Sequence, residues 1–157
     1  MPVLSYDHIV ADLEQFARNA PSAEHLMSGI VSQLKHLPQY NWVGFYMLAP
    51  DDPNLLVLGP YMGAQTPHKR IPLNQGICGA AAATGKTIVV DDVNADPRYL
   101  ACSLETRSEI VAPVYARGRV VGELDIDSHK LAAFQAADRV LVERCAAIVG
   151  RYLETHE

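Results

Sequence analysis

One stretch of the chain, residues 102–128, carries most of the side chains that could do redox and acid–base chemistry. It contains the thiol of Cys102 and several carboxyl groups, including those of Glu109, Glu123, Asp125 and Asp127. In a strand over residues 119–127 the last three carboxyls share one face, because side chains alternate along a strand. A thiol near such a cluster indicates redox chemistry on a small cationic or zwitterionic molecule. A half-buried strand with one solvated face has the same pattern, so both interpretations stay open.

The three cysteines differ in their predicted surroundings. Cys102 lies in an irregular segment, where a thiol is accessible, and Arg98 and Arg107 are close enough in sequence to stabilise its anion. It is therefore the best candidate for a nucleophile. Cys78 starts an alanine-rich helix, where backbone N–H groups and the helix dipole favour a thiolate, although a small buried residue beneath the helix is an equal alternative. Cys145 occupies an apolar position of the last helix and is predicted to belong to the core.

The composition is that of a single folded domain. Of the 157 residues, 49% are hydrophobic and 20% are charged, which provides enough apolar material for a buried core. The net charge is −5, without the basic run that nucleic-acid binding requires. No apolar run approaches the roughly 20 residues of a membrane span, and residues 1–7 lack the features of a signal peptide. We therefore expect a cytoplasmic protein that binds neither nucleic acid nor membranes.

The sequence predicts no metal site and no cofactor. Three cysteines without a Cys-x-x-Cys pair and six scattered histidines show no metal-ligand spacing. Gly85-Lys86-Thr87 resembles part of a phosphate-binding loop. However, Gly79 and Gly85 enclose one residue more than that loop contains, and Gly85 is predicted to end a helix rather than to precede one.

Hydrophobic periodicity predicts the order helix, helix, a run of strands with one inserted helix, and helix. The predicted helices are residues 9–16, 26–37, 76–84 and 137–152, and the predicted strands are residues 41–48, 55–58, 70–72, 87–90, 109–116 and 119–127. Asp96-Pro97 could start one further helical turn. Short turns between successive strands favour an antiparallel sheet with the helices gathered on one face, which is an α+β fold.

The first predicted strand carries three aromatic side chains. Alternation places Trp42 and Tyr46 on one face and Phe45 on the other. Packing in the core is the default role of such side chains. The alternative for Trp42 and Tyr46 is the wall of a pocket for a small apolar group.

Eight short motifs occur in an order and at spacings that resemble one known family. They are Asn41-Trp42-Val43-Gly44-Phe45-Tyr46, Leu58-Gly59-Pro60, Arg70-Ile71-Pro72, Gly76-Ile77-Cys78-Gly79, Asp92-Val93, Leu100-Ala101-Cys102, Ser108-Glu109-Ile110-Val111 and Leu124-Asp125-Ile126-Asp127-Ser128. Over about residues 40–140 the chain is similar to the free methionine-R-sulfoxide reductases, which are single GAF domains. The resemblance implies one GAF domain over residues 1–157, a six-stranded antiparallel sheet flanked by N- and C-terminal helices, and a homodimer.

The resemblance also implies an activity. In that family a thiolate attacks the sulfur of free methionine-R-sulfoxide, and a second cysteine captures the resulting sulfenic acid as a disulfide, which thioredoxin reduces. Carried over to this chain, Cys102 is the attacking residue. A protonated carboxyl, that of Glu109 or Asp125, handles the departing oxygen.

Substrate recognition follows from the same resemblance. Asp125 and Asp127 suit the ammonium group of a free amino acid, which a methionine within a peptide lacks. Trp42 and Tyr46 would line the space for the S-methyl end.

Two positions depart from the family. His68 stands where the family usually has a further cysteine, commonly the one that resolves the sulfenic acid. Either Cys78 or an external thiol then resolves it, or turnover is less efficient. Glu123 stands where the family usually has an apolar residue, and its carboxyl either alters the ligand preference of the pocket or points to water.

Two other functions stay open besides the enzyme. One is a GAF sensor module that binds a small amino-acid-like ligand without catalysis. Such a module normally carries an effector domain, and the absence of one here favours the enzyme. The other is a structural dimerisation domain, which would need neither the acidic strand nor Cys102.

Overall fold

The predicted helices and strands are present in the computed structural model, which describes residues 5–100 and 104–156. The helices are α1 (Asp7–Asn19), α2 (Ala23–Lys35), α3 (Gly76–Thr84) and α4 (Ala136–Thr155), with a short 3-10 helix, η1 (Val93–Ala95). The strands are β1 (Trp42–Ala49), β2 (Asp52–Met62), β3 (Arg70–Pro72), β4 (Ile88–Val90), β5 (Ser108–Ala116) and β6 (Arg119–Ser128).

Two elements differ from the sequence-based expectation. Strand β2 is longer than expected, because it continues past residue 58 along β1 as far as Met62. The short helical turn lies at Val93–Ala95 and not at Asp96-Pro97, because the Asp92 side chain accepts a hydrogen bond from the Asn94 N–H at 3.1 Å and so starts the turn earlier.

The six strands form one antiparallel sheet in the order β3-β2-β1-β6-β5-β4, which confirms the predicted sheet. The central contact joins β1 to β6, which are far apart in the sequence. It pairs Trp42 with Asp127 and Tyr46 with Glu123. The β5–β6 hairpin then pairs Glu109 with Asp127. Strand pairing therefore brings aromatic and acidic side chains from three strands to neighbouring positions.

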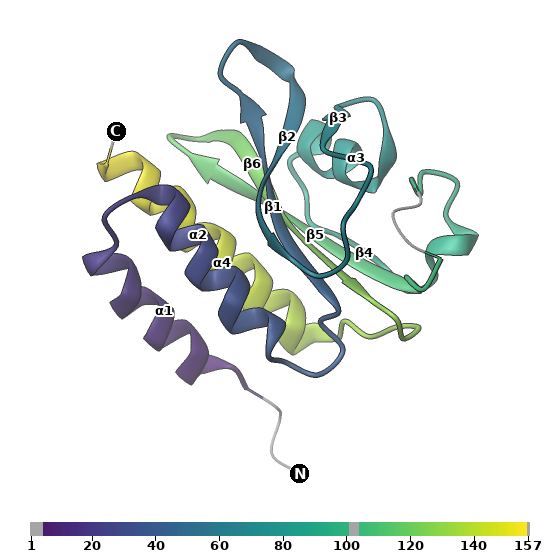
Figure 1. The fold of residues 1–157 in the computed structure, drawn as a ribbon, viewed down its shortest axis with the longest axis horizontal. Helices are drawn as coiled ribbons and strands as arrows, with labels where there is room; N and C mark the ends of the chain where they lie inside the picture. The colour runs from purple at the N-terminus through teal and green to yellow at the C-terminus, as the bar shows by residue number, and fades with distance from the viewer. Residues whose placement is uncertain (1–4, 101–103, 157) are drawn as a thin grey trace.

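The helices lie on both faces of the sheet. Helices α2 and α4 cover one face, with α1 packed on the outside of these two helices, and α3 packs on the other face (Figure 1). The expectation that all helices gather on one face is therefore wrong for α3, and the reason is that both faces carry side chains that need cover. Phe45 packs under α2 and α4, whereas Trp42 and Tyr46 pack on the α3 side, as alternation predicted. Among the described helices, none is both long and apolar enough to cross a membrane.

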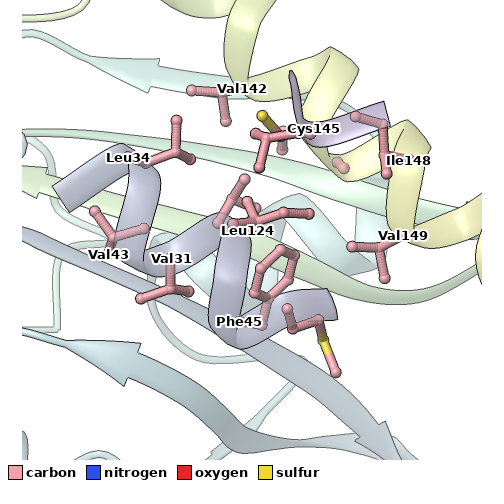
Figure 2. Packing of buried hydrophobic residues seen from close by; sticks show 14 of the residues in the cluster. Val31, Leu34, Val43, Phe45, Leu124, Val142, Cys145, Ile148 and Val149 are labelled. Atoms are coloured by element: carbon pink, nitrogen blue, oxygen red, sulfur yellow. The ribbon is translucent and has the colours of Figure 1, made fainter. Parts of the chain in front are cut away.

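The larger core fills the space between the sheet and helices α2 and α4 (Figure 2). It includes Val31 and Leu34 from α2, Val43, Phe45 and Leu124 from the sheet, and Val142, Cys145, Ile148 and Val149 from α4. Cys145 is fully buried here, which confirms its predicted place in the core. Because Leu124 and Ile126 are fixed in this core, the alternating acidic residues of β6 must point to the α3 side.

Helix α3 lies very close to the chain that follows β3. A Cβ atom at Gly79 would be 2.9 Å from the carbonyl oxygens of Pro72 and Leu73, so only glycine permits this approach. The helix ends at Gly85, which adopts a left-handed conformation with a φ of 69°, as predicted for a C-cap. The approach lets α3 cover the acidic face of β6.

Candidate active site

The acidic face of the sheet is buried, not solvated. Glu109 on β5 and Glu123, Asp125 and Asp127 on β6 are all at most 4% exposed. Helix α3 covers them, and its Cys78 is 6% exposed. The interpretation of β6 as a half-buried strand with a wet face is therefore wrong.

The Cys78 thiol lies among these carboxyls. Its Sγ donates a hydrogen bond to Asp125 Oδ2 at 3.3 Å. Ligand atoms of Cys78, Glu109 and Asp125 all lie within 4.8 Å of one another. Three separate elements bring them together, so no sequence spacing could reveal the cluster, and its donor set is one that could hold a metal ion.

Of the two alternatives for Cys78, the small buried residue beneath the helix is supported and the thiolate is contradicted. Burial raises the pKa of the Cys78 thiol well above its usual range, and the negative charges of Asp125, Glu123 and Glu109 raise it further. A helix N-terminus supplies only about half a positive charge. Desolvation and three carboxyl neighbours outweigh it, so the thiol is neutral at rest.

The carboxyls form a set that retains protons. Burial raises the pKa of Glu109 well above its usual range, followed by the charges of Asp125 and Asp127. Burial likewise raises the pKa of Asp127, with the Asp125 charge next. The pKa of Asp125 is raised by burial as well, but hydrogen bonds from Glu109, Cys78 and Asp127 act against the rise. Asp125 is thus the acceptor of the set, and Glu109 and Asp127 can serve as acids.

Of the four carboxyls, Glu123 is the one whose burial is least offset by hydrogen bonds. It is fully buried, and neither of its carboxyl oxygens has a hydrogen-bond partner among the described residues. Burial raises its pKa well above the usual range. Of the two alternatives for Glu123, the one in which its carboxyl points to water is therefore wrong. It does not line the cavity beside Cys78, but when it is ionised its charge raises the pKa of that thiol.

Two small cavities adjoin the cluster. The first has a volume of about 10 Å³, is lined by Tyr46, Cys78, Glu109 and Asp125 among others, and has room for one water molecule. Trp42 and Asp127 line the second, of about 80 Å³. The predicted site residues that the structure describes therefore divide between these two cavities. An amino acid needs more space than the first cavity offers, so its lining must shift when such a ligand enters.

The aromatic residues of β1 hold the segment that closes both cavities. The Tyr46 hydroxyl donates a hydrogen bond to the His68 carbonyl oxygen at 2.7 Å. The Trp42 indole donates one to the Ala64 carbonyl oxygen at 2.9 Å. The two rings stack with their centroids 6.3 Å apart. Both residues therefore shape the cavities, in agreement with a pocket wall rather than with core packing alone.

The structure adds lining residues that the sequence did not single out. Leu100, Ile71 and Ile77 line the first cavity, and His68 lies there as well. Leu100 precedes Cys102 by two residues in one of the quoted motifs, which was the available signal. Cys102 itself is outside the described residues, so its predicted role stays a prediction.

We expect Glu123→Gln to stabilise the protein, and more at pH 8 than at pH 5. A glutamate with a raised folded-state pKa binds its proton more tightly in the folded than in the unfolded chain. From about pH 4.3, the ordinary glutamate pKa, the free energy of unfolding of the wild type therefore falls as pH rises, until the raised pKa is passed. Glutamine does not titrate. The free energy of unfolding of the variant, relative to that of the wild type, therefore rises by at most about 1.4 kcal/mol per pH unit.

Urea unfolding at the two pH values, with a chelator present, measures this gain. Glu24→Gln, an exposed position on α2, is the control and should alter stability equally at both. The prediction would be contradicted if the free energies of unfolding of wild type and Glu123→Gln differed by the same amount at both pH values.

Comparison with known proteins agrees with this architecture. The GAF domain family model matches residues 22–153. The chain is 35% identical to the free methionine-R-sulfoxide reductase of Escherichia coli, over 77% of this chain and 71% of that protein. It is 38% identical to the enzyme of that name from Saccharomyces cerevisiae, over 71% of this chain and 62% of that one.

A solved structure matches the chain over nearly its full length. The free methionine-R-sulfoxide reductase from Neisseria meningitidis, in complex with its substrate, superimposes with a TM-score of 0.89 at 36% identity, covering 95% of this chain and 88% of that one. The family match and these relatives show that the chain is a single GAF domain and belongs to the family of the free methionine-R-sulfoxide reductases.

Proposed function

We propose that this protein reduces free methionine-R-sulfoxide to methionine by cysteine chemistry. The observation that carries the proposal is the buried cluster of Cys78, Glu109, Asp125 and Asp127, which holds protons beside a thiol. The Neisseria meningitidis relative, described as in complex with its substrate, supports the same substrate for this chain.

The first proposed step transfers oxygen from the substrate to a cysteine. The Cys102 thiolate attacks the sulfoxide sulfur while an acid protonates the oxygen. The substrate S–O bond and the S–S bond formed by the attack then break, and the oxygen bonds to the Cys102 sulfur as a hydroxyl. Methionine leaves and Cys102 is a sulfenic acid, so the methionine sulfur gains the two electrons that the cysteine sulfur loses. Leu100 lines the cavity beside the carboxyls, which favours Cys102 as the thiol that serves this site.

The acid in this step is a carboxyl that stays protonated near neutral pH. Glu109 fits because burial and two acidic neighbours raise its pKa. A protonated carboxyl next to the oxygen lowers the barrier by donating as negative charge develops. Asp125 accepts hydrogen bonds in the resting site and can return the proton to Glu109.

The same carboxyls provide a site for the substrate ammonium. Asp127 and Asp125 lie on one face of β6, and Asp127 lines the second cavity with Trp42. An ammonium there replaces a proton and is desolvated between carboxylates. This would restrict the enzyme to free amino acids. Trp42 and Tyr46 would contact the S-methyl end.

The second proposed step resolves the sulfenic acid. Another thiol attacks the Cys102 sulfur, a disulfide forms and water leaves. Cys78 is the internal candidate, but it is buried and hydrogen-bonded to Asp125, so the start of α3 must shift first. We further propose thioredoxin as the final reductant, a homodimer and a cytoplasmic location.

The reductase assay tests the proposal directly. Purified protein should reduce free methionine-R-sulfoxide with thioredoxin or dithiothreitol, and should not reduce the S epimer or a peptide-bound sulfoxide.

Cys102→Ser should abolish turnover with either reductant, because a serine hydroxyl cannot take up the oxygen. Cys145→Ala, in the opposite core, is the control and should remain active. Binding of the sulfoxide without turnover by the wild type would favour the GAF sensor module instead.

Asp125→Asn and Glu109→Gln should each lower kcat/KM. The expected loss of transition-state stabilisation is about 2–4 kcal/mol, the scale of losing a buried charge partner or a key donor. The free-amino-acid requirement should appear as rejection of N-acetylmethionine sulfoxide by the wild type. Steady-state kinetics measure both effects, with Glu143→Gln on the exposed side of α4 as the control. Equal rates on free and N-acetylated substrate would rule out the ammonium site.

Resolution should proceed through a Cys78–Cys102 disulfide. Mass spectrometry after one equivalent of substrate should find this bond in the wild type and a Cys102 sulfenic acid in Cys78→Ser. A stable sulfenic acid in the wild type, with Cys78 still reduced, would show that an external thiol resolves it.

His68→Cys should raise the thioredoxin-dependent rate, since it adds a thiol at the cavity.

A further inference from the structure

We propose that the reduced protein binds one Zn²⁺ ion per chain between Cys78, Glu109 and Asp125. The proposal concerns binding and does not depend on the reductase activity. It differs from the sequence-based expectation, which was that there is no metal site. The sequence could not show this site, because its ligands come from α3, β5 and β6 and share no local spacing.

The distances within the cluster suit a zinc ion. In a tetrahedral site with Zn–S of about 2.3 Å and Zn–O of about 2.0 Å, the sulfur and oxygen ligands lie about 3.5 Å apart. Cys78 Sγ and Asp125 Oδ2 are already 3.3 Å apart. A ligand atom of Glu109 lies within 4.8 Å of both. The ion would therefore replace the thiol proton that now joins Cys78 to Asp125, with little movement of the backbone.

Unsatisfied buried atoms beside the cluster point to a missing positive partner. Asp125 Oδ1 and both carboxyl oxygens of Glu123 are buried without a hydrogen-bond partner among the described residues. When Glu123 is ionised, it also places negative charge next to the Cys78 thiol. Buried polar atoms are almost always paired, so this group of unpaired oxygens is unusual.

No described side chain supplies the positive charge. None of the ion pairs of the described lysines, arginines and histidines involves the four carboxyls of the α3 face. Buried carboxyls that lack a cationic partner either keep their protons or bind a metal. A divalent ion would offset the charge of the thiolate and one or two carboxylates at once.

The size and the donor set of the site select the metal. The cavity lined by Cys78, Glu109 and Asp125 has a volume of about 10 Å³, which admits one small ion or one water molecule. Mg²⁺ retains several waters and avoids thiolates, and Ca²⁺ needs six or more oxygen ligands. Zn²⁺ accepts one sulfur and two oxygen ligands and does not require a full set of six oxygen ligands or retained waters.

The cation and the proposed substrate would exclude each other. Zn²⁺ would engage the carboxyls that the reductase proposal assigns to the proton and the ammonium, and it would hold Cys78 as a bound thiolate. If that proposal holds, zinc inhibits the reaction competitively with methionine sulfoxide.

The first experiment isolates the Cys78 thiol. In the double variant Cys102→Ser/Cys145→Ala, Cys78 is the only remaining cysteine. Titration of the reduced double variant with Cd²⁺, a probe for thiolate–metal bonds, should give an ultraviolet charge-transfer band that saturates at one equivalent. Adding Cys78→Ser should remove the band. No band in the double variant would overturn the proposal, since no other thiol is present.

The second experiment tests the carboxyl ligands with Zn²⁺ alone. Calorimetric titration of the metal-free double variant should show one site, and Asp125→Asn and Glu109→Gln should each weaken it about 10- to 100-fold. Glu143→Gln is the control and should bind as the parent does, and Mg²⁺ should not bind. Unchanged zinc affinity in both carboxyl variants would refute the site. Thermal unfolding checks the folds, because Zn²⁺ should raise the midpoint of the parent but not that of the variant lacking Cys78.

Discussion

The burial of a row of carboxyl groups beneath one short helix is the constraint on which the rest of this structure depends. An isolated buried carboxylate costs several kcal/mol, about as much as one large core side chain contributes. The chain reduces that cost by keeping protons on Glu109 and Asp127 and by directing hydrogen bonds to Asp125. Glu123 also keeps its proton, but neither of its carboxyl oxygens has a hydrogen-bond partner among the described residues, so it is the position where the structure tolerates the greatest cost. An arrangement of this kind persists only if other parts of the fold stabilise it.

The stabilisation comes from the opposite face of the same strand. Leu124 and Ile126 alternate with the acidic residues of β6 and are fully buried under α2 and α4. Burial of each such side chain contributes about 1.5–3 kcal/mol. A register slip that released the carboxyls to solvent would bring these apolar side chains out with them, because neighbouring residues of a strand exchange faces together. The larger core therefore holds the acids in place.

Much of this could be predicted from the sequence, and the remainder could not, for physical reasons. Period-two alternation fixed the faces of Trp42, Phe45 and the acidic residues, because it depends only on local geometry. The depth of burial depended on α3, a short alanine-rich helix whose composition does not say which surface it covers. The thiolate expected at Cys78 was wrong because the helix dipole is local, whereas Asp125 comes from 47 positions away. The closure of the cavities by the segment after β2 likewise depends on hydrogen bonds to main-chain carbonyls, which leave no trace in the residue types.

The same carboxyls can be satisfied by a proton, by the ammonium of a free amino acid or by a divalent ion. Since burial raises their pKa values, protons occupy them at rest, and any other cation must displace a proton to enter. In the proposed reduction this exchange serves the chemistry. An ammonium that enters beside Asp127 displaces a proton in a site with little water, and Asp125 is the neighbouring acceptor. The proton thus stays where the sulfoxide oxygen needs it. A metal ion displaces protons too, but it occupies the acceptors afterwards and leaves none to donate, so ligand binding prepares the site for reaction only when the cation is the substrate.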